Sequence, residues 1–326
     1  MGDSARAFWV TGPSQGEIRD VTLPSRGPGD VLVRTRFTGI SRGTESLVFS
    51  GRVPQSEWTR MRAPFQDGDF PAPVKYGYMN VGVVEDGPPE LRGRHVFVLY
   101  PHQTRYVVPA SWAHSLPDGL TPRRAVLAAN LETAVNGLWD ARPHVGDRIT
   151  VIGAGTVGCL VAWLAARVAA CRVQLVDVNP RRADIARGLK VPFASPGTAE
   201  AGADLVIHAS GAPDGLELAL RLAGLEATIV ELSWYGDRPV TLPLGGAFHA
   251  NRLTIASSQV GRIAPSQRAR WDSRRRMRLV LDLLGDPSLD ALLTGESRFE
   301  ALPETMSALA RSAGDTLCHV VRYDDV

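Results

Sequence analysis

The residues best suited to chemistry in this sequence form a short glycine-rich segment. Gly153-Ala154-Gly155-Thr156-Val157-Gly158 has GxGxxG spacing, follows the apolar segment 149–152 and precedes a helical pattern over 156–169. In such a loop the first glycine permits a tight turn, the second lets the backbone approach a pyrophosphate, and the third allows the helix to pack closely on the strand. Thr156 and Val157 would lie at a helix N-terminus, whose free N–H groups bind phosphates. The segment therefore predicts a dinucleotide-binding site.

An acidic residue lies where such a site needs one. Asp177 ends a strand-like segment and comes 19 residues after Gly158. A carboxylate at this place accepts hydrogen bonds from the adenosine ribose and repels a 2′-phosphate, which favours NAD over NADP. We expect Asn179 to line the same site. Arg181 and Arg182 follow, and they could neutralise a 2′-phosphate if they turned inward, so NADP stays an alternative.

Two further segments should complete the cofactor site. Ser210-Gly211 follows the strand-like segment 204–209, and Ser233-Trp234 follows the segment 227–232. Ligands of open α/β sheets bind at the carboxyl ends of the strands, so we expect both segments to lie near the nicotinamide. Trp234 and Tyr235 could flank the substrate, and the alternative is that one of them only packs at the domain interface.

The elements around these residues divide the chain in two. Short strand-like segments interrupted by Gly and Pro predict an antiparallel, barrel-like domain; they lie at 7–10, 30–37, 81–85, 95–99 and 105–109. From Thr121 onward helical and strand-like segments alternate, with strands expected at 148–152, 172–177, 204–209, 227–232 and 253–257. This alternation is typical of a parallel sheet covered on both faces. The predicted fold class is α/β, with a β-barrel domain followed by a doubly wound parallel sheet.

Composition and charge exclude several classes of protein. With 44% apolar residues, the 326-residue chain can bury a large core. Its net charge of +2 gives no broad electrostatic field for nucleic acid or an anionic membrane. Glycines and arginines interrupt the apolar run 149–176, so no membrane span is predicted. Cys159, Cys171 and Cys318 have no CxxC spacing and the N-terminus has no apolar signal core, which favours a cytoplasmic location.

Nearly the whole chain resembles the medium-chain dehydrogenase/reductase superfamily. Gly39-Ile40-Ser41-Arg42-Gly43-Thr44-Glu45 is similar to the family's Gly-Ile-Cys-Gly-Thr-Asp segment with one residue added, and Lys75-Tyr76-Gly77-Tyr78-Met79-Asn80-Val81-Gly82 to its Gly-His-Glu-x-x-Gly segment. Together with Ser50-Gly51-Arg52-Val53-Pro54, the first motif most resembles the bacteriochlorophyllide dehydrogenase subgroup. The resemblance implies a homodimer whose chains have a GroES-like catalytic domain (1–121), a Rossmann NAD-binding domain (122–261) and a C-terminal return to the catalytic domain (262–326).

The resemblance also indicates where this sequence departs from zinc-dependent relatives. Ser41, Tyr78 and Ala129 occupy the positions of the catalytic zinc ligands, and the four-cysteine structural zinc lobe is missing. None of the three suits zinc in such a site, so we expect neither metal. A hydrogen-bond donor must then stabilise charge on the substrate oxygen. We expect Tyr78 to be that donor, with Thr44 and Ser41 extending a proton relay to solvent. The alternative for Tyr78 is a wall residue of the barrel.

Several other features have both a structural and a functional interpretation. Segment 52–74, rich in Pro, Gly and large apolar side chains, is either a loop folded on its own domain or a wall of a substrate pocket. Six arginines within 268–278 are typical of a solvated helix face, with an anionic substrate or a subunit contact as alternatives. For Glu132, a helix N-terminal or hydrogen-bonding role is favoured over a metal. The histidines have no metal-ligand spacing, so most are expected to be surface or hydrogen-bonded residues.

These features predict a zinc-independent, NAD(H)-dependent oxidoreductase that interconverts a secondary alcohol and a ketone on a small or medium-sized biosynthetic intermediate. One alternative is NAD(P)H-dependent reduction of an activated carbon–carbon double bond, as in zinc-free quinone and enoyl reductases. Those enzymes usually prefer NADPH and lack an acid such as Asp177. The other alternative is a dinucleotide-binding protein without turnover. The expected partner is a small-molecule substrate, not nucleic acid or a membrane.

Overall fold

The computed structural model describes residues 4–312 and 314–324, and these form two units. The first unit combines Met1–Ala129 with Leu281–Val326, and the second is Asn130–Val280. The boundaries expected from the sequence lay at 121/122 and 261/262. The α/β class is confirmed, because one unit is built on antiparallel sheet and the other on a parallel sheet.

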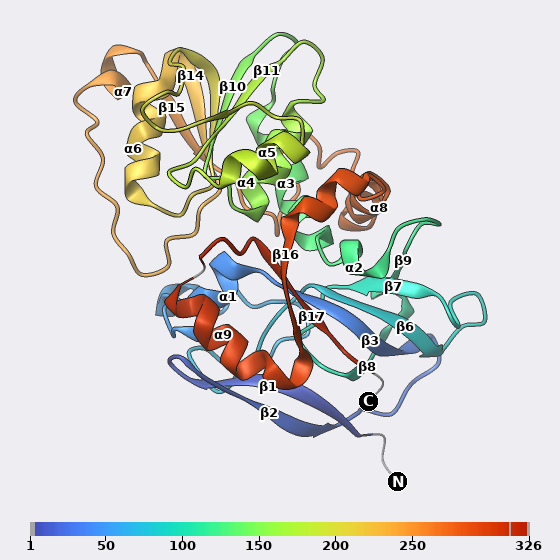
Figure 1. Ribbon diagram of the computed structural model, residues 1–326. Helices are drawn as coiled ribbons and strands as arrows, with labels where there is room; N and C mark the ends of the chain where they lie inside the picture. The colour runs from blue at the N-terminus through green and yellow to red at the C-terminus, as the bar shows by residue number, and fades with distance from the viewer. Residues whose placement is uncertain (1–3, 313, 325–326) are drawn as a thin grey trace. The chain divides into compact units, whose positions relative to one another are not determined.

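Two sheets make up most of the first unit (Figure 1). The smaller has the order β2 (Gln15–Thr22), β1 (Ser4–Gly12), β5 (Val74–Lys75), β4 (Asp67–Gly68). The larger has the order β16 (Leu293–Arg298), β17 (Cys318–Arg322), β3 (Asp30–Ile40), β6 (Asn80–Asp86), β7 (His95–Val98), β9 (His114–Ser115), and β8 (Arg105–Pro109) pairs with β3. Buried and part-exposed residues alternate along most of β3, as in a strand that turns one face to a core. Val31, Val33, Val96 and Tyr106 belong to that core.

Segment 52–74 packs on its own unit, in agreement with the first of its two interpretations. Phe70 is buried. The ring centroid of Phe65 lies 5.3 Å from that of Tyr100 and 5.0 Å from that of Trp112. The helices of this unit are α1 (Arg42–Phe49), α2 (Pro122–Ala125) and α9 (Leu302–Arg311), with short 3-10 turns at Gln55–Glu57, Ala110–Trp112, Pro287–Leu292 and Phe299–Ala301.

The second unit is a doubly wound parallel sheet. Its strand order is β12 (Phe193–Ala194), β11 (Arg172–Val176), β10 (Arg148–Ile152), β13 (Ala203–His208), β14 (Ala223–Glu231), β15 (Thr254–Ser257). The order reverses between β10 and β13, which is where ligands bind in sheets of this kind. Each of the five strands predicted for this part is present.

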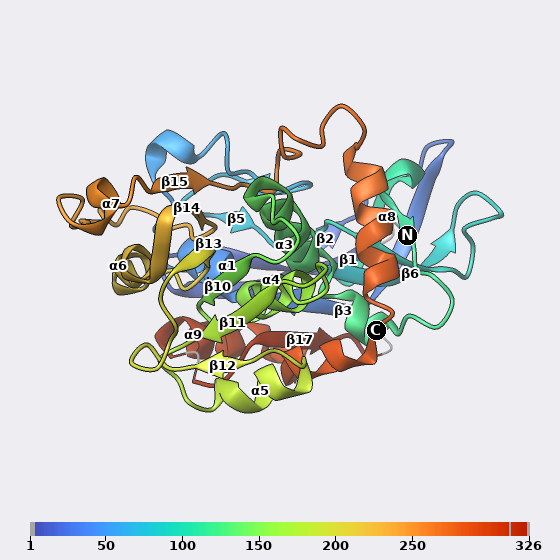
Figure 2. The same ribbon diagram turned by 90° about the horizontal axis from the view of Figure 1, so that it is seen from above.

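Helices lie on both faces of this sheet. The second unit contains α4 (Thr156–Ala165), α5 (Arg182–Gly188), α6 (Pro213–Leu222), α7 (Ala247–Ala250) and most of α3 (Ala128–Ala141) and α8 (Ser273–Leu283). Figure 2 shows the sheet nearly edge-on, with α4 and α5 on one face and α6 on the other. Right-handed crossovers require this, because the chain moves one way from β10 to β12 and the opposite way from β13 to β15. No helix joins β12 to β13; residues 195–202 form a loop instead.

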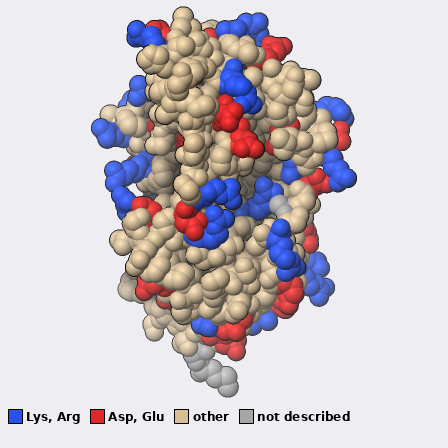
Figure 3. All heavy atoms as spheres, turned by 90° about the vertical axis from the view of Figure 1, so that its left-hand side faces the viewer, with Lys and Arg blue, Asp and Glu red and all other residues tan. Residues whose placement is uncertain are grey.

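Basic and acidic side chains are interspersed over the face shown in Figure 3. None of the helices that the structure describes is long and apolar enough to cross a membrane. Cys159, Cys171 and Cys318 are all free thiols.

Candidate functional site

The glycine-rich loop joins β10 to α4 in the second unit. Gly153 has a φ of 101°, and a Cβ atom there would lie 2.6 Å from the Cα of Ser210. At Gly158 a Cβ would lie 1.8 Å from the carbonyl oxygen of Gly153. The chain's own packing therefore requires glycine at both positions. Gly155, the N-cap of α4, has no heavy atom within 4 Å of a Cβ position. Its missing side chain leaves open surface, which suits the close approach of a pyrophosphate.

Asp177 follows β11, and its side chain is hydrogen-bonded to the glycine-rich loop. Its carboxylate accepts hydrogen bonds from the backbone N–H of Ala154 at 2.6 Å and of Asn179 at 2.8 Å. The side chain is partly exposed, and each carboxylate oxygen has a second lone pair. Asp177 can therefore accept ribose hydroxyls as well. Thr156 and Val157, the first residues of α4, are also partly exposed beside the loop.

The two arginines after Asp177 differ in exposure. Arg181 is exposed, whereas Arg182 is buried in α5. Burial raises the pKa of the Cys159 thiol to about 12, and nearby Arg182 partly opposes that rise. Of the two, Arg181 is therefore the one at the surface, where a 2′-phosphate could meet it.

The segments after β13 and β14 meet each other and the glycine-rich loop. The backbone N–H of Gly211 donates to Ser233 Oγ at 3.0 Å, and Ser210 packs against Gly153. Ser210 is exposed, and Ser233 and Trp234 are partly exposed. The structure thus gathers the residues predicted from the sequence to bind the cofactor at the carboxyl edge of one sheet, except that the Arg182 side chain is buried in α5.

Two residues at this edge were not predicted to belong to the site. His208 ends β13 and Glu231 ends β14, and the two are direct neighbours across the sheet. His208 Nδ1 lies 2.8 Å from Glu231 Oε2, and His208 Nε2 lies 2.6 Å from Ser210 Oγ. The imidazole is fully buried. A polar residue at the end of each of two apolar strands was the available signal, but the register that pairs them appears only in the folded sheet.

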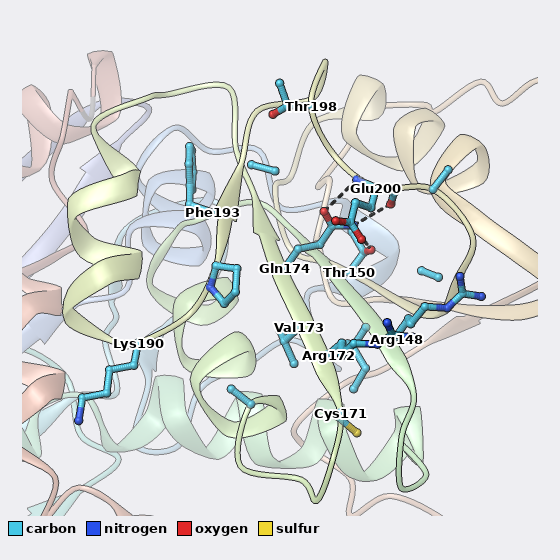
Figure 4. A pocket seen from close by; sticks show the side chains of 16 residues that line it. Arg148, Thr150, Cys171, Arg172, Val173, Gln174, Lys190, Phe193, Thr198 and Glu200 are labelled. Atoms are coloured by element: carbon cyan, nitrogen blue, oxygen red, sulfur yellow. Dashed lines mark hydrogen bonds between the residues drawn. The ribbon is translucent and has the colours of Figure 1, made fainter.

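A separate hollow of about 750 Å³ lies elsewhere on this unit (Figure 4). Arg148, Arg172 and Ala203, which begin β10, β11 and β13, line it together with Thr198 and Glu200 of the loop after β12. The predicted cofactor residues do not line it, because they follow the opposite ends of these strands.

The three predicted catalytic residues come together in the first unit. Ser41 is the N-cap of α1, Thr44 lies in the first turn of that helix, and the Tyr78 hydroxyl makes hydrogen bonds with both side chains. Burial raises the pKa of Tyr78 to about 12; Glu45 adds to the rise and the two hydrogen bonds oppose it. Tyr78 therefore keeps its proton at neutral pH. If Ser41 and Thr44 both donate to the phenol oxygen, its own hydrogen is free for a ligand.

A buried acid–base pair supports this cluster. Glu45 Oε1 accepts the Ser41 backbone N–H at 2.7 Å, and Glu45 Oε2 lies 2.9 Å from His102 Nε2. His102 Nδ1 lies 2.6 Å from Thr38 Oγ1, which lies 3.3 Å from the Tyr323 hydroxyl. From the sequence most histidines were expected to be surface or hydrogen-bonded residues, and His102 is hydrogen-bonded. Its link to Glu45 spans 57 residues, so local sequence does not reveal it.

At the third predicted ligand position Ala129 has no metal-binding group, and the carboxylate of nearby Glu132 is bound by an arginine. Ala129 is buried. Glu132 in α3 bonds to Arg276 of α8 at 3.0 Å, and both side chains are buried. This is the hydrogen-bonding role favoured for Glu132. The interpretation of the arginine run 268–278 as a solvated helix face is wrong for Arg276, which is buried. The other five arginines of the run are exposed. Within residues 4–312 and 314–324, no group of three or more His, Cys, Asp or Glu side chains is arranged to hold a metal ion.

Known proteins resemble this chain in sequence and in fold, although no family model matches it. D-guloside 3-dehydrogenase of Escherichia coli (strain K12) is 27% identical over 285 residues, which cover 78% of this chain and 81% of that protein. The 2-desacetyl-2-hydroxyethyl bacteriochlorophyllide A dehydrogenase of Rhodobacter capsulatus is 27% identical over 259 residues, covering 73% and 75%. A putative zinc-binding dehydrogenase from Sinorhizobium meliloti 1021, solved with NADP bound, superposes with a TM-score of 0.77 at 18% identity over 98% of this chain and 99% of that chain.

Proposed function

Since the homologues and structural neighbours of this chain are medium-chain dehydrogenase/reductase enzymes, we propose that it interconverts a secondary alcohol and a ketone with NAD(H). The two sequence relatives are named as dehydrogenases of a guloside and of a hydroxyethyl bacteriochlorophyllide, both of which are alcohols. The proposed substrate is a small or medium-sized biosynthetic intermediate that carries a secondary hydroxyl group.

The observation that carries the proposal is the open surface at Gly155 beside Asp177. Packing explains glycine at positions 153 and 158, but at Gly155 nothing in the chain occupies the space of a side chain. A pyrophosphate fits that space, and the N-terminus of α4 offers it N–H groups. Asp177 lies at the same loop with lone pairs for the adenosine ribose and a charge that opposes a 2′-phosphate.

The chain's own contribution to the reaction would come from Tyr78. A bound nicotinamide supplies or accepts the hydride. The protein must then hold the substrate oxygen and move one proton. Tyr78 stays protonated, so it can donate a hydrogen bond to a ketone oxygen. An alkoxide is about as basic as hydroxide and is a stronger base than a phenolate, so a phenol would give it a proton favourably even with its pKa raised to about 12.

Zinc does not fit the donor set of this cluster. Ser41 and Tyr78 are hydroxyl ligands hydrogen-bonded to one another, and catalytic zinc sites in proteins use His, Cys and carboxylate. Glu45, the acid nearest to them, already binds the Ser41 backbone and His102. We therefore propose chemistry in which a phenol, not a metal, polarises the substrate oxygen.

The direct test measures binding first and turnover second. Calorimetric titration of the purified protein with NADH and NADPH should give the tighter dissociation constant for NADH. A panel of secondary alcohols, including sugar glycosides, is then screened for nicotinamide absorbance with NAD, and ketones with NADH. Turnover of an enone but of no alcohol or ketone would replace the proposal with double-bond reduction. Tight NADH binding without any turnover would leave a dinucleotide-binding protein.

A further inference from the structure

A connected set of side chains surrounds Glu231 at the carboxyl edge of the parallel sheet. Glu231 Oε1 accepts the backbone N–H of Ser233 at 2.7 Å, and Glu231 Oε2 accepts the Tyr235 hydroxyl at 3.0 Å. His208 Nδ1 lies 2.8 Å from Glu231 Oε2. A carboxylate has only acceptor oxygens, so a hydrogen bond between it and a ring nitrogen needs its hydrogen on that nitrogen. The hydrogen on His208 must therefore reside on Nδ1.

This tautomer determines what the other side of the ring can do. With Nδ1 protonated, Nε2 of a neutral imidazole carries a lone pair. Ser210 Oγ lies 2.6 Å from it, so the Ser210 hydroxyl donates its hydrogen to Nε2. The other possible acceptor for that hydrogen, the carbonyl oxygen of Ala212, is 3.5 Å away. Ser210 is thus fixed with its hydrogen pointing inward.

Ser210 is left as an acceptor on its exposed side. A hydroxyl oxygen has two lone pairs, and the backbone N–H of Ala212 takes one of them at 3.1 Å. In the part of the chain that the structure describes, the second lone pair remains for a ligand, and Ser210 is exposed. Such a group recognises a donor such as a sugar hydroxyl. It does not suit a phosphate oxygen, which offers only lone pairs.

The position of Ser210 indicates which sugar that is. Asp177 follows β11 and Ser210 follows β13, and these strands flank β10 on opposite sides. The glycine-rich loop between them packs directly against Ser210 through Gly153. A dinucleotide whose pyrophosphate lies on this loop and whose adenosine ribose meets Asp177 carries its second ribose toward β13.

We propose that His208 and Glu231 are positioning residues that hold Ser210 as a hydrogen-bond acceptor for a hydroxyl of the second ribose, the one that bears nicotinamide. This rests on the proposed function and extends it to a specific contact. Gly215 of α6 is consistent with the arrangement. A Cβ there would lie 2.4 Å from Ser210 Oγ and 2.6 Å from His208 Nε2, so glycine lets the helix pack over this hydrogen bond.

The test compares three probes that share the adenosine end. AMP lacks the second ribose, ADP-ribose contains it, and NADH adds the nicotinamide. Ser210→Ala should weaken the binding of ADP-ribose and NADH by about 3- to 10-fold, which is the range expected for one hydrogen bond. The affinity for AMP should stay unchanged. Ser195→Ala, an exposed serine after β12, is the matched control and should change none of the three dissociation constants.

The role of His208 is tested by two substitutions whose side chains differ in length. His208→Asn keeps an amide near the Nδ1 position but offers no acceptor at Nε2, so ADP-ribose affinity should fall as in Ser210→Ala. The double variant, Ser210→Ala with His208→Asn, should lose no more ADP-ribose affinity than either single variant, because both substitutions remove the same contact. His208→Gln, whose amide oxygen reaches the Nε2 position, should recover part of the affinity.

Distinct outcomes separate this inference from the proposed function. A wild-type protein that binds none of the three probes would contradict the proposed function itself. Normal ADP-ribose binding by Ser210→Ala, when the wild type binds all three probes, would overturn only the assignment of Ser210. If His208→Asn lowered AMP and ADP-ribose affinity equally, or if its effect added to that of Ser210→Ala, His208 would be a structural residue only.

Discussion

Glu45 and His102 form a buried pair, with Glu45 Oε2 2.9 Å from His102 Nε2. The pair ties the first turn of α1 to the segment after β7, since Glu45 also accepts the backbone N–H of the N-cap residue Ser41. Gly77 packs against the same imidazole, because a Cβ there would lie 3.0 Å from His102 Cδ2. The elements that carry Ser41, Thr44 and Tyr78 therefore share one internal support.

Removing this support should cost stability. His102→Ala leaves the Glu45 carboxylate and the Thr38 hydroxyl buried without their partner, and breaking a buried pair costs about 3 kcal/mol or more. His144→Ala is the control, because 86% of that side chain is exposed, and it should change stability by less than about 0.5 kcal/mol. Urea unfolding followed by circular dichroism measures both. Equal effects of the two substitutions would contradict the expectation.

The arginine run offers a similar comparison within α8. Arg276 bonds to Glu132 at 3.0 Å and to Asn136 at 2.6 Å, and it is buried. Arg276→Gln leaves Glu132 without its counter-ion and should lower the free energy of unfolding by about 3–5 kcal/mol. Arg274→Gln, two residues away and exposed, should stay within about 0.5 kcal/mol. A small effect at Arg276 would mean that water replaces the guanidinium.

The cofactor loop and the buried histidine–glutamate pairs differ in how far the sequence could predict them. Gly153, Gly155, Gly158 and Asp177 are predictable because they lie on one strand–turn–helix–strand unit, in which spacing along the chain fixes spacing in the fold. Glu45 with His102, and His208 with Glu231, lie on separate elements. Their contacts depend on strand register and helix placement, which many distant residues decide together.

The same distinction holds for the fold. Long apolar strands such as β10 and β13 have patterns that indicate their ends to within one residue. β2 and β16 were not predicted from the sequence. Their burial patterns contain few or no buried residues, so they lack the hydrophobic alternation on which such a prediction rests. Arg276 shows that the burial of a charged side chain is hard to predict, since a run of arginines does not indicate which one turns inward.

Asp177 should determine the affinity for NADH. Asp177→Ala removes both the ribose acceptor and the bond to the backbone of Ala154. We expect NADH binding to weaken at least about 10-fold and the preference over NADPH to disappear. Asp184→Ala is the control, because that side chain is 74% exposed on α5. Titrations with NADH and NADPH provide the measurement. A variant that bound NADH as tightly as the wild type would refute the assignment.

The purified protein should contain no stoichiometric zinc. Ser41, Tyr78 and Ala129 stand where the resemblance to zinc enzymes expects ligands, and none of the three is a His, Cys or carboxylate. Elemental analysis by mass spectrometry should find well under one zinc per chain, and activity should survive dialysis against a chelator. One zinc per chain, lost together with activity on chelation, would show that the ligands come from other residues.

Tyr78 should act through its hydroxyl alone. Tyr78→Phe preserves the ring and removes the donor to the substrate oxygen, so turnover should fall at least about 10-fold, while NADH affinity, which depends on the other unit, stays the same. Because its pKa is raised to about 12, the wild type should keep its rate from neutral pH to about pH 10 as far as this group is concerned. Tyr100→Phe, a substitution on the same unit at a ring stacked on Tyr106, is the control and should turn over normally. Normal turnover by Tyr78→Phe would make Tyr78 a packing residue and direct attention to Thr44 or Ser41.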